Sequence, residues 1–205
     1  LTIRAFEVAD RYRNPVFVLA DGFIGQMMEP VMFPDPLPQR PEPDWAVRGD
    51  AATRKNLLSS IFLEPDELEA HNRKLQEKYA AIEANEALST EFHTEDAKLI
   101  VVAYGIVSRV LRSAVALARH ENIPVGLFRP VTLWPFPKAR LNDLAGRAKR
   151  VMSFELSNGQ MIDDIRLALR DRVPVSLHNR MGGNVPSAEE CLDAIRQSAR
   201  EGGLL

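Results

Sequence analysis

Polar and glycine residues that could bind a ligand gather in short segments of the C-terminal half, each directly after an apolar run. In chain order they are Gly105, Arg129, Trp134, Asn158, Gly159, Gln160, Arg180, Gly182 and Gly183. An arginine can hold a carboxylate or phosphate through two parallel hydrogen bonds, and free backbone N–H groups at a helix start can hold an anion. We interpret these segments as the rim of a ligand cleft or of a subunit interface.

A purely structural role stays open for each segment. Arg129 could equally hold a carboxylate of another domain or subunit, and the Ser157–Gln160 segment could be a tight turn. The aromatic side chains Trp134 and Phe136, which stand between prolines, could anchor an interface or pack beneath their own loop. Glu155 ends an apolar run, and we favour a partner for an arginine over an acid or base.

Motifs for several known chemistries are missing from the sequence. There is no GxGxxG and no GxxxxGK[ST] motif, and the four histidines are not spaced as metal ligands. No serine has a nucleophile-elbow context. Cys191 is the single cysteine, and we expect a buried structural thiol in the last helix. We therefore predict no metal site and no complete catalytic constellation.

Strand-like and helix-like segments alternate from Lys98 to Arg200, and four helices follow four strands. The predicted strands are 99–103, 123–128, 151–155 and 174–177, and the predicted helices are 107–119, 138–145, 161–170 and 187–199. This alternation predicts a mainly parallel sheet with helices on both faces. Right-handed crossovers place every carboxyl end at one edge, where such sheets bind ligands.

The N-terminal part is organised differently. Residues 1–32 read as helix, buried strand (15–20) and helix. Six prolines between Pro30 and Pro43 make 33–64 a linker or arm. Residues 65–97 form an acidic helical connector, and 98–205 form the sheet domain.

Composition limits the class of protein. The chain has 205 residues, 45% of them hydrophobic and 26% charged, with a net charge of −2. The near-neutral balance argues against nucleic acid as a partner, and no apolar run reaches the ~18 residues of a membrane span. A single cysteine fits a reducing cytoplasm.

Several strings in a fixed order point to one family. They are AFEVADRYRNPV at 5–16, DGFIGQMMEPV at 21–31, VAYG at 102–105, RPVTLWPFP at 129–137, ELSNGQM at 155–161 and RMGG at 180–183. Together they resemble the alpha chain of 2-oxoacid:ferredoxin oxidoreductases. The resemblance is strongest to the 3-methyl-2-oxobutanoate (ketoisovalerate) type, with the 2-oxoglutarate type as its neighbour, and it covers nearly the whole chain.

The resemblance implies a fold and an activity. The fold would be a three-layer α/β/α transketolase C-terminal-like domain preceded by the end of a pyrimidine-binding-type domain. The resemblance puts Asp21, Gly22 and Gln26 where that pyrimidine-type domain could approach the cofactor edge, without assigning them a contact. Such enzymes decarboxylate a 2-oxoacid on thiamine diphosphate, reduce ferredoxin through iron–sulfur clusters and release an acyl-CoA. The resemblance places thiamine diphosphate and magnesium mainly on a beta chain, and the clusters on other subunits. The partners it implies are the beta, gamma and ferredoxin-like subunits of one complex, and ferredoxin.

The sequence also departs from that family. The Tyr-Pro-Ile-Thr-Pro type motif of the alpha chain, and the glutamate that activates the aminopyrimidine, are not in it. We therefore expect Leu1 to fall late in the pyrimidine-type domain, no catalytic residue to be transferable, and this piece alone to be inactive. A non-catalytic assembly or regulatory module, or a subunit using lipoamide or NAD, remain alternatives.

Overall fold

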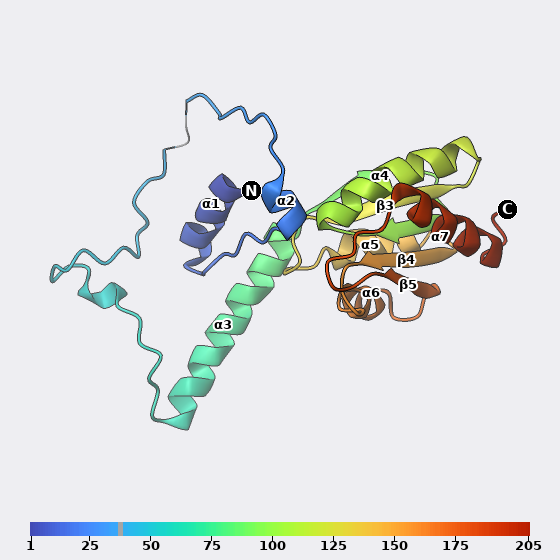
Figure 1. Ribbon diagram of the computed structural model, residues 1–205. Helices are drawn as coiled ribbons and strands as arrows, with labels where there is room; N and C mark the ends of the chain where they lie inside the picture. The colour runs from blue at the N-terminus through green and yellow to red at the C-terminus, as the bar shows by residue number, and fades with distance from the viewer. Residues whose placement is uncertain (37–38) are drawn as a thin grey trace. The chain divides into compact units, whose positions relative to one another are not determined.

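The computed structural model of the chain describes residues 1–36 and 39–205 (Figure 1). Leu37 and Pro38, which belong to the predicted proline-rich linker, lie outside the described residues. The chain divides into two compact units. The helical unit comprises residues 1–20 and 26–86, and the sheet unit comprises residues 21–25 and 87–205.

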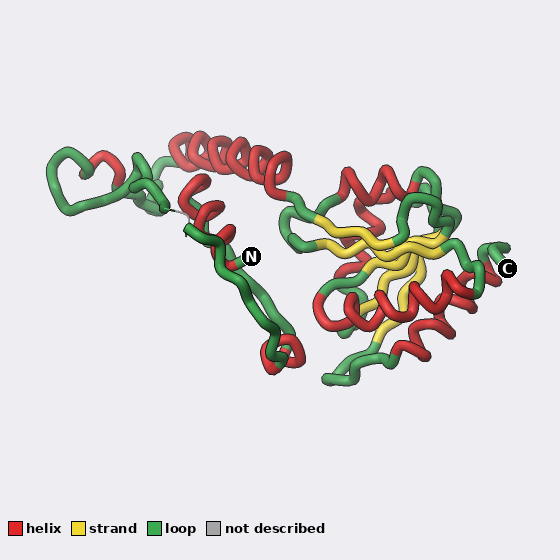
Figure 2. Tube along the Cα trace, turned by 90° about the horizontal axis from the view of Figure 1, so that it is seen from above, coloured by secondary structure: helices red, strands yellow, loops and turns green. Residues whose placement is uncertain are grey.

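The sheet unit is built on five strands in the order β1-β3-β2-β4-β5, drawn in yellow in Figure 2. Their bounds are β1 Ser89–Phe92, β2 Leu99–Val102, β3 Val125–Pro130, β4 Arg150–Glu155 and β5 Val175–Asn179. The first strand runs antiparallel to β3, and all other pairs are parallel. The predicted α/β fold with a mainly parallel sheet is therefore confirmed, although β1 was not predicted.

Helices cover both faces of this sheet (Figure 1). One hydrophobic cluster joins the sheet to α4 (Gly105–His120) and α7 (Ala188–Glu201), and the other joins it to α5 (Lys138–Ala145) and α6 (Met161–Leu169). Successive side chains of a strand point to opposite faces. The central strand β2 follows this rule, since Leu99 and Val101 enter the first cluster and Ile100 and Val102 the second.

One glycine of the sheet is required by a close backbone approach. A Cβ atom on Gly126 of β3 would lie 2.4 Å from the carbonyl oxygen of His93, in the segment that follows β1. Backbone cannot yield as a flexible side chain does, so a larger residue here would displace the edge of the sheet.

The helical unit is held mainly by polar contacts. It contains α1 (Thr2–Tyr12), the short 3₁₀ helix η1 (Arg54–Asn56) and α3 (Pro65–Glu86). Glu86 is only 3% exposed. Its carboxylate accepts hydrogen bonds from Arg4 Nη2 at 2.9 Å and from Arg11 Nη1 at 2.7 Å. Trp45 Nε1 donates to the Asp10 carbonyl at 2.8 Å, which ties the proline-rich segment to α1.

The predicted buried strand at residues 15–20 is wrong. These residues form neither helix nor strand, and Phe17 and Leu19 are 81% and 78% exposed. A strand needs a neighbour to satisfy its backbone groups. The described residues of the helical unit include no other strand, so apolar composition alone could not produce one here.

The short helix α2 (Gly22–Gln26) is divided between the units. Gly22–Gly25 belong to the sheet unit, and Gln26 belongs to the helical unit. Among the described residues, no helix has both the length and the apolar character needed to cross a membrane.

Candidate functional site

The loops that follow β2, β3, β4 and β5 leave the sheet at the carboxyl ends of these parallel strands, as predicted. This edge therefore collects most of the candidate residues. Arg129 differs from its predicted place, because β3 extends to Pro130 and Arg129 pairs with Thr90 of β1 inside the ladder. The antiparallel strand that the sequence did not reveal thus fixes the backbone of Arg129.

Asp21 caps two helices at this edge. Its Oδ1 accepts the N–H of Ile24 in α2 at 2.8 Å, and its Oδ2 accepts the N–H of Ile106 in α4 at 2.8 Å. Gly105 makes the approach possible, because it has φ +60° and a Cβ there would lie 2.6 Å from Asp21 Oδ2. The carboxylate complements the positive end of α4, so this helix start is not free to bind another anion.

Glu155 fills the start of α6 in the same way. It is 3% exposed and accepts hydrogen bonds from Ser153 Oγ, Ser157 Oγ and the backbone N–H groups of Gln160, Met161 and Ile162, at 2.6–3.0 Å. Two expectations are corrected here. The partner of Glu155 is a helix start rather than an arginine, and the N–H groups of Gln160, Met161 and Ile162, which could have held an external anion, are occupied by this carboxylate.

These contacts also set the charge of Glu155. Burial raises the pKa of its carboxyl, but the hydrogen bonds from Ser157, Ser153 and the α6 backbone lower it more, so the pKa lies below its usual range. Tyr104, at the end of β2, is affected by both capping carboxylates. Burial first, and then the charges of Glu155 and Asp21, raise the pKa of its phenol. Tyr104 is therefore a neutral hydroxyl at this edge, which the sequence analysis did not single out.

Arg129 is a cation at this edge whose Nε has no hydrogen-bond partner among the described residues. This Nε is also buried. A buried donor without a partner costs about 1–3 kcal/mol. The carboxylates of Asp21 and Glu155 are both hydrogen-bonded to helix starts and do not pair with Arg129. An incoming carboxylate would therefore form its most stabilising contact at this edge with Arg129.

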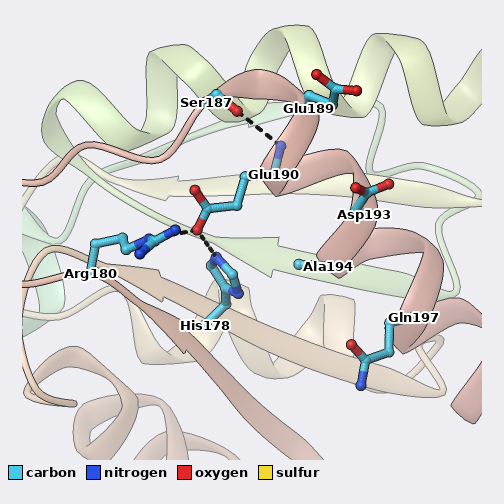
Figure 3. A pocket seen from close by; sticks show the side chains of 8 residues that line it. All are labelled: His178, Arg180, Ser187, Glu189, Glu190, Asp193, Ala194 and Gln197. Atoms are coloured by element: carbon cyan, nitrogen blue, oxygen red, sulfur yellow. Dashed lines mark hydrogen bonds and ion pairs between the residues drawn. The ribbon is translucent and has the colours of Figure 1, made fainter.

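Arg180 belongs to a second polar cluster, between β5 and α7 (Figure 3). Its Nε donates to Glu190 Oε1 at 2.7 Å, and His178 Nε2 lies 3.1 Å from the same oxygen. The Arg180 hydrogen bond is the main reason why the pKa of Glu190 is lowered. The cluster lines a groove of about 520 Å³.

The other candidate residues contribute shape rather than charge. Trp134 is 54% exposed, while Phe136 packs against the α5–α6 cluster. Gly159, Gly182 and Gly183 have φ of +91°, +66° and +84°, which suits turns. Those exposed at the surface are Gly22, Gln26, Asn158, Gln160, Gly182 and Gly183.

Metal ligation finds no support in the described residues, where no group of three or more His, Cys, Asp or Glu side chains could hold an ion. Cys191 is buried, as predicted, and burial raises the pKa of its thiol to about 12. A thiol of this kind stays protonated and does not serve as a metal ligand.

Comparison with known proteins shows that most of the sheet unit matches a known protein domain. Residues 97–191 match the family model of the pyruvate:ferredoxin oxidoreductase core domain II. Two proteins described as ketoisovalerate oxidoreductase subunit VorB, from Methanothermobacter thermautotrophicus and Methanothermobacter marburgensis, are 54% and 52% identical over 97% and 98% of this chain. The chain is a homologue of ketoisovalerate oxidoreductase subunit VorB.

This chain spans only part of the two VorB subunits, namely 56% and 57% of their lengths. The 2-oxoglutarate synthase subunit KorA of Methanothermobacter thermautotrophicus is more distant, with 27% identity over 97% of this chain and 60% of that protein. A solved 2-oxoglutarate:ferredoxin oxidoreductase from Magnetococcus marinus shares the fold, with a TM-score of 0.60 and 21% identity. This match covers 66% of this chain and 24% of that one.

Proposed function

We propose that this chain is the C-terminal part of the alpha subunit of a thiamine diphosphate-dependent 2-oxoacid:ferredoxin oxidoreductase. With its partner chains it would oxidise and decarboxylate a branched-chain 2-oxoacid, 3-methyl-2-oxobutanoate, to the acyl-CoA, with ferredoxin as electron acceptor. The observation that carries this proposal is the 54% identity to subunit VorB over 97% of the chain. The solved relative, which is described with 2-oxoglutarate, coenzyme A and succinyl-CoA bound, supports the reaction class.

The division into parts belongs to the same proposal. Residues 1–32 would end a pyrimidine-binding-type domain, 33–64 would be a linker or arm, 65–97 an acidic helical connector, and 98–205 the transketolase C-terminal-like domain. The helix of the connector is α3, and the connector's last residues, which include β1, already belong to the sheet unit. The exposed apolar side chains of Phe17 and Leu19 support the proposal that residues 1–32 are only the end of a domain. Burial of apolar surface against the rest of such a domain would stabilise it by about 25 cal/mol per Å².

The described residues do not fit the diphosphate of the cofactor or an iron–sulfur cluster. The starts of α4 and α6 are capped by Asp21 and Glu155, which would repel a diphosphate. The one cysteine is a buried, protonated thiol. In this proposal, partner chains (beta, gamma and ferredoxin-like) hold thiamine diphosphate, magnesium and the clusters in a cytoplasmic complex, and this chain supplies positioning and assembly.

Within that role we assign Arg129 to assembly. Its buried, unpartnered Nε would donate a hydrogen bond to a carboxylate of a partner subunit at the carboxyl edge of the sheet. Truncating one member of a buried charge pair costs about 2–5 kcal/mol, which is more than tenfold in Kd. Arg129→Ala should therefore weaken binding of the partner subunits while leaving the unfolding of the chain itself almost unchanged.

A matched control for that variant is Arg112→Ala, because Arg112 is an exposed α4 arginine that lies over the Phe92 ring at 4.6 Å. Its effect on the Kd should stay within about twofold. Equal Kd values for wild type and Arg129→Ala would contradict the assignment of Arg129 to the subunit interface.

The activity is tested with the full-length protein purified together with its native partner chains. Reduction of methyl viologen should require both a 2-oxoacid and CoA, and 3-methyl-2-oxobutanoate should have the highest kcat/KM among several 2-oxoacids. No reduction with any 2-oxoacid by a complete complex would overturn the proposal, and a lipoyl-bearing partner would point to a different enzyme class.

A further inference from the structure

β5 is the outer strand of the sheet, and one side of its backbone has no partner strand among the described residues. Val151 N donates to the Pro174 carbonyl at 3.0 Å, and Arg180 N donates to the Glu155 carbonyl at 3.0 Å. Backbone groups of a strand alternate between its two sides. The even-numbered residues 174–180 therefore face β4, and the amides and carbonyls of Val175, Leu177 and Asn179 face outward.

Three common protections against pairing are missing from this edge. Natural edge strands are commonly blocked by proline, lysine or a bulge. The sequence Val175–Asn179 contains neither proline nor lysine, and its register with β4 runs without interruption over five residue pairs. Three outward amides and three outward carbonyls are thus available to a further strand.

A groove lies beside this edge on the face covered by α7 (Figure 3). It is lined by His178 and Arg180 from β5 and its continuation, and by Ser187, Glu189, Glu190, Asp193, Ala194 and Gln197 of the α7 segment. Glu190 is bound by Arg180 and His178, and Asp193 is bound by Arg196 at 2.7 Å. Glu189 is exposed and has no ion pair among the described residues, so the groove keeps an excess of negative charge.

We propose that β5 receives an extended segment of a partner chain as a sixth strand, with a lysine or arginine side chain directed into the groove toward Glu189. Backbone hydrogen bonds would supply affinity, and the groove would select the side chain. Every second residue of an added strand faces α7, so the segment would carry basic residues at alternate positions. This surface goes beyond the function proposed above, which assigns no role to β5.

A second copy of this chain fits less well as the occupant. Pairing β5 with itself would place two acidic grooves beside each other. It would bring only His178 and Arg180 as basic groups, and both already bind Glu190. Like charges placed opposite each other destabilise a strand pair. Charge complementarity therefore favours a basic segment of a different chain.

The test compares hydrogen exchange in the full-length protein alone and in its natively purified complex, with residue-level resolution. The amides of Val175, Leu177 and Asn179 should exchange at least tenfold more slowly in the complex. The amides of Ser176 and His178 should be protected in both states, because β4 already binds them. This alternation separates an added strand from simple coverage of the surface.

Variants at one position isolate the backbone contribution. Leu177→Pro removes an outward N–H without removing a bond to β4, and proline is tolerated on that side of an edge strand. It should weaken assembly at least tenfold, whereas Leu177→Ala, which keeps the N–H, should stay within twofold. Glu189→Lys should weaken assembly more than Glu189→Gln, and this pair does not depend on how β5 tolerates proline.

Unchanged exchange at Val175, Leu177 and Asn179 on assembly would overturn the proposal. So would protection of these amides in the protein alone together with a dimer mass by light scattering, because the occupant would then be a second copy. Neither readout uses 2-oxoacid turnover, so failure here is distinguishable from failure of the proposed function.

Discussion

The two units differ in how they bury apolar side chains. The sheet unit has two cores with residues such as Leu111, Phe128 and Ile165 fully buried, one on each face of the sheet. In the helical unit only Ile82 and Glu86 are buried among the described residues, and many large apolar side chains are exposed. A helix such as α3 satisfies its backbone groups locally, whereas a strand needs a neighbour. The comparison shows that the sheet unit buries its apolar side chains beneath its own helices, whereas the helical unit leaves most of its apolar side chains exposed.

The largest expected difference comes from the same substitution made in each unit. Leu111→Ala, at a side chain with 0% exposure, should lower the free energy of unfolding by about 2–5 kcal/mol. Leu19→Ala, at 78% exposure, should change it by less than about 0.5 kcal/mol in the 205-residue chain. Urea unfolding followed by circular dichroism measures both. Similar losses for the two variants would contradict the contrast between the units.

The next effect is expected at Glu155, in the sheet unit. Glu155→Gln puts an amide where five donors converge, and should cost about 1–3 kcal/mol at pH 7. The folded pKa of Glu155 is lowered, so its contribution is present above the unfolded pKa of about 4.3 and is lost as the pH falls through the folded pKa.

The difference between wild type and Glu155→Gln should therefore shrink as the pH is lowered below about 4.3. Thermal unfolding at several pH values measures it, and Glu189→Gln, at an exposed carboxylate with no ion pair among the described residues, is the control. A difference that is independent of pH would mean that the charge of Glu155 does not stabilise the start of α6.

A smaller effect is expected from the cap of α7. Ser187 Oγ accepts the N–H of Glu190 at 3.1 Å, so Ser187 is the N-cap of this helix. Ser187→Ala should cost about 1 kcal/mol, and Ser187→Asp should retain most of the stability. Chemical unfolding of the two variants checks this, and equal losses would show that the hydroxyl is not the cap.

The smallest effect is expected in the helical unit, at Arg11. This side chain is 59% exposed, although its partner Glu86 is buried and also binds Arg4. Arg11→Ala should cost less than about 1 kcal/mol and should speed amide exchange in α1 without affecting β2–β4. A loss shared by the strands of the sheet would show that the two units unfold together.

Much of the sheet unit could be predicted because its signals are local. Apolar runs bounded by turns identified β2 to β5, and helical spacing identified α4 to α7 within a few residues at each end. β1 escaped prediction because its four residues, Ser89–Phe92, are mostly polar and its pairing with β3 is long-range. The strand predicted at 15–20 failed for the opposite reason, since its local composition was suitable but no strand pairs with it.

The candidate site was less predictable, because its contacts join distant positions. Asp21 lies 85 residues from Ile106, whose N–H it accepts, and nothing in either segment alone indicates this pair. Glu155 could be placed at the end of β4, but its partners depend on how the following turn folds back. Arg129 was identified by its residue type, but its place within β3 and its buried, unpartnered Nε are visible only in the structure.

Limited proteolysis of the 205-residue chain with thermolysin tests the contrast between the units most directly. Thermolysin cleaves before apolar residues, which are exposed at Phe17, Met28, Ile61 and Leu63. We predict rapid cleavage before residue 87 and a resistant fragment that begins near Ala87 and contains all five strands, as read by mass spectrometry. Cleavage within β2, β3 or β4 at the same rate as at these sites would contradict the account.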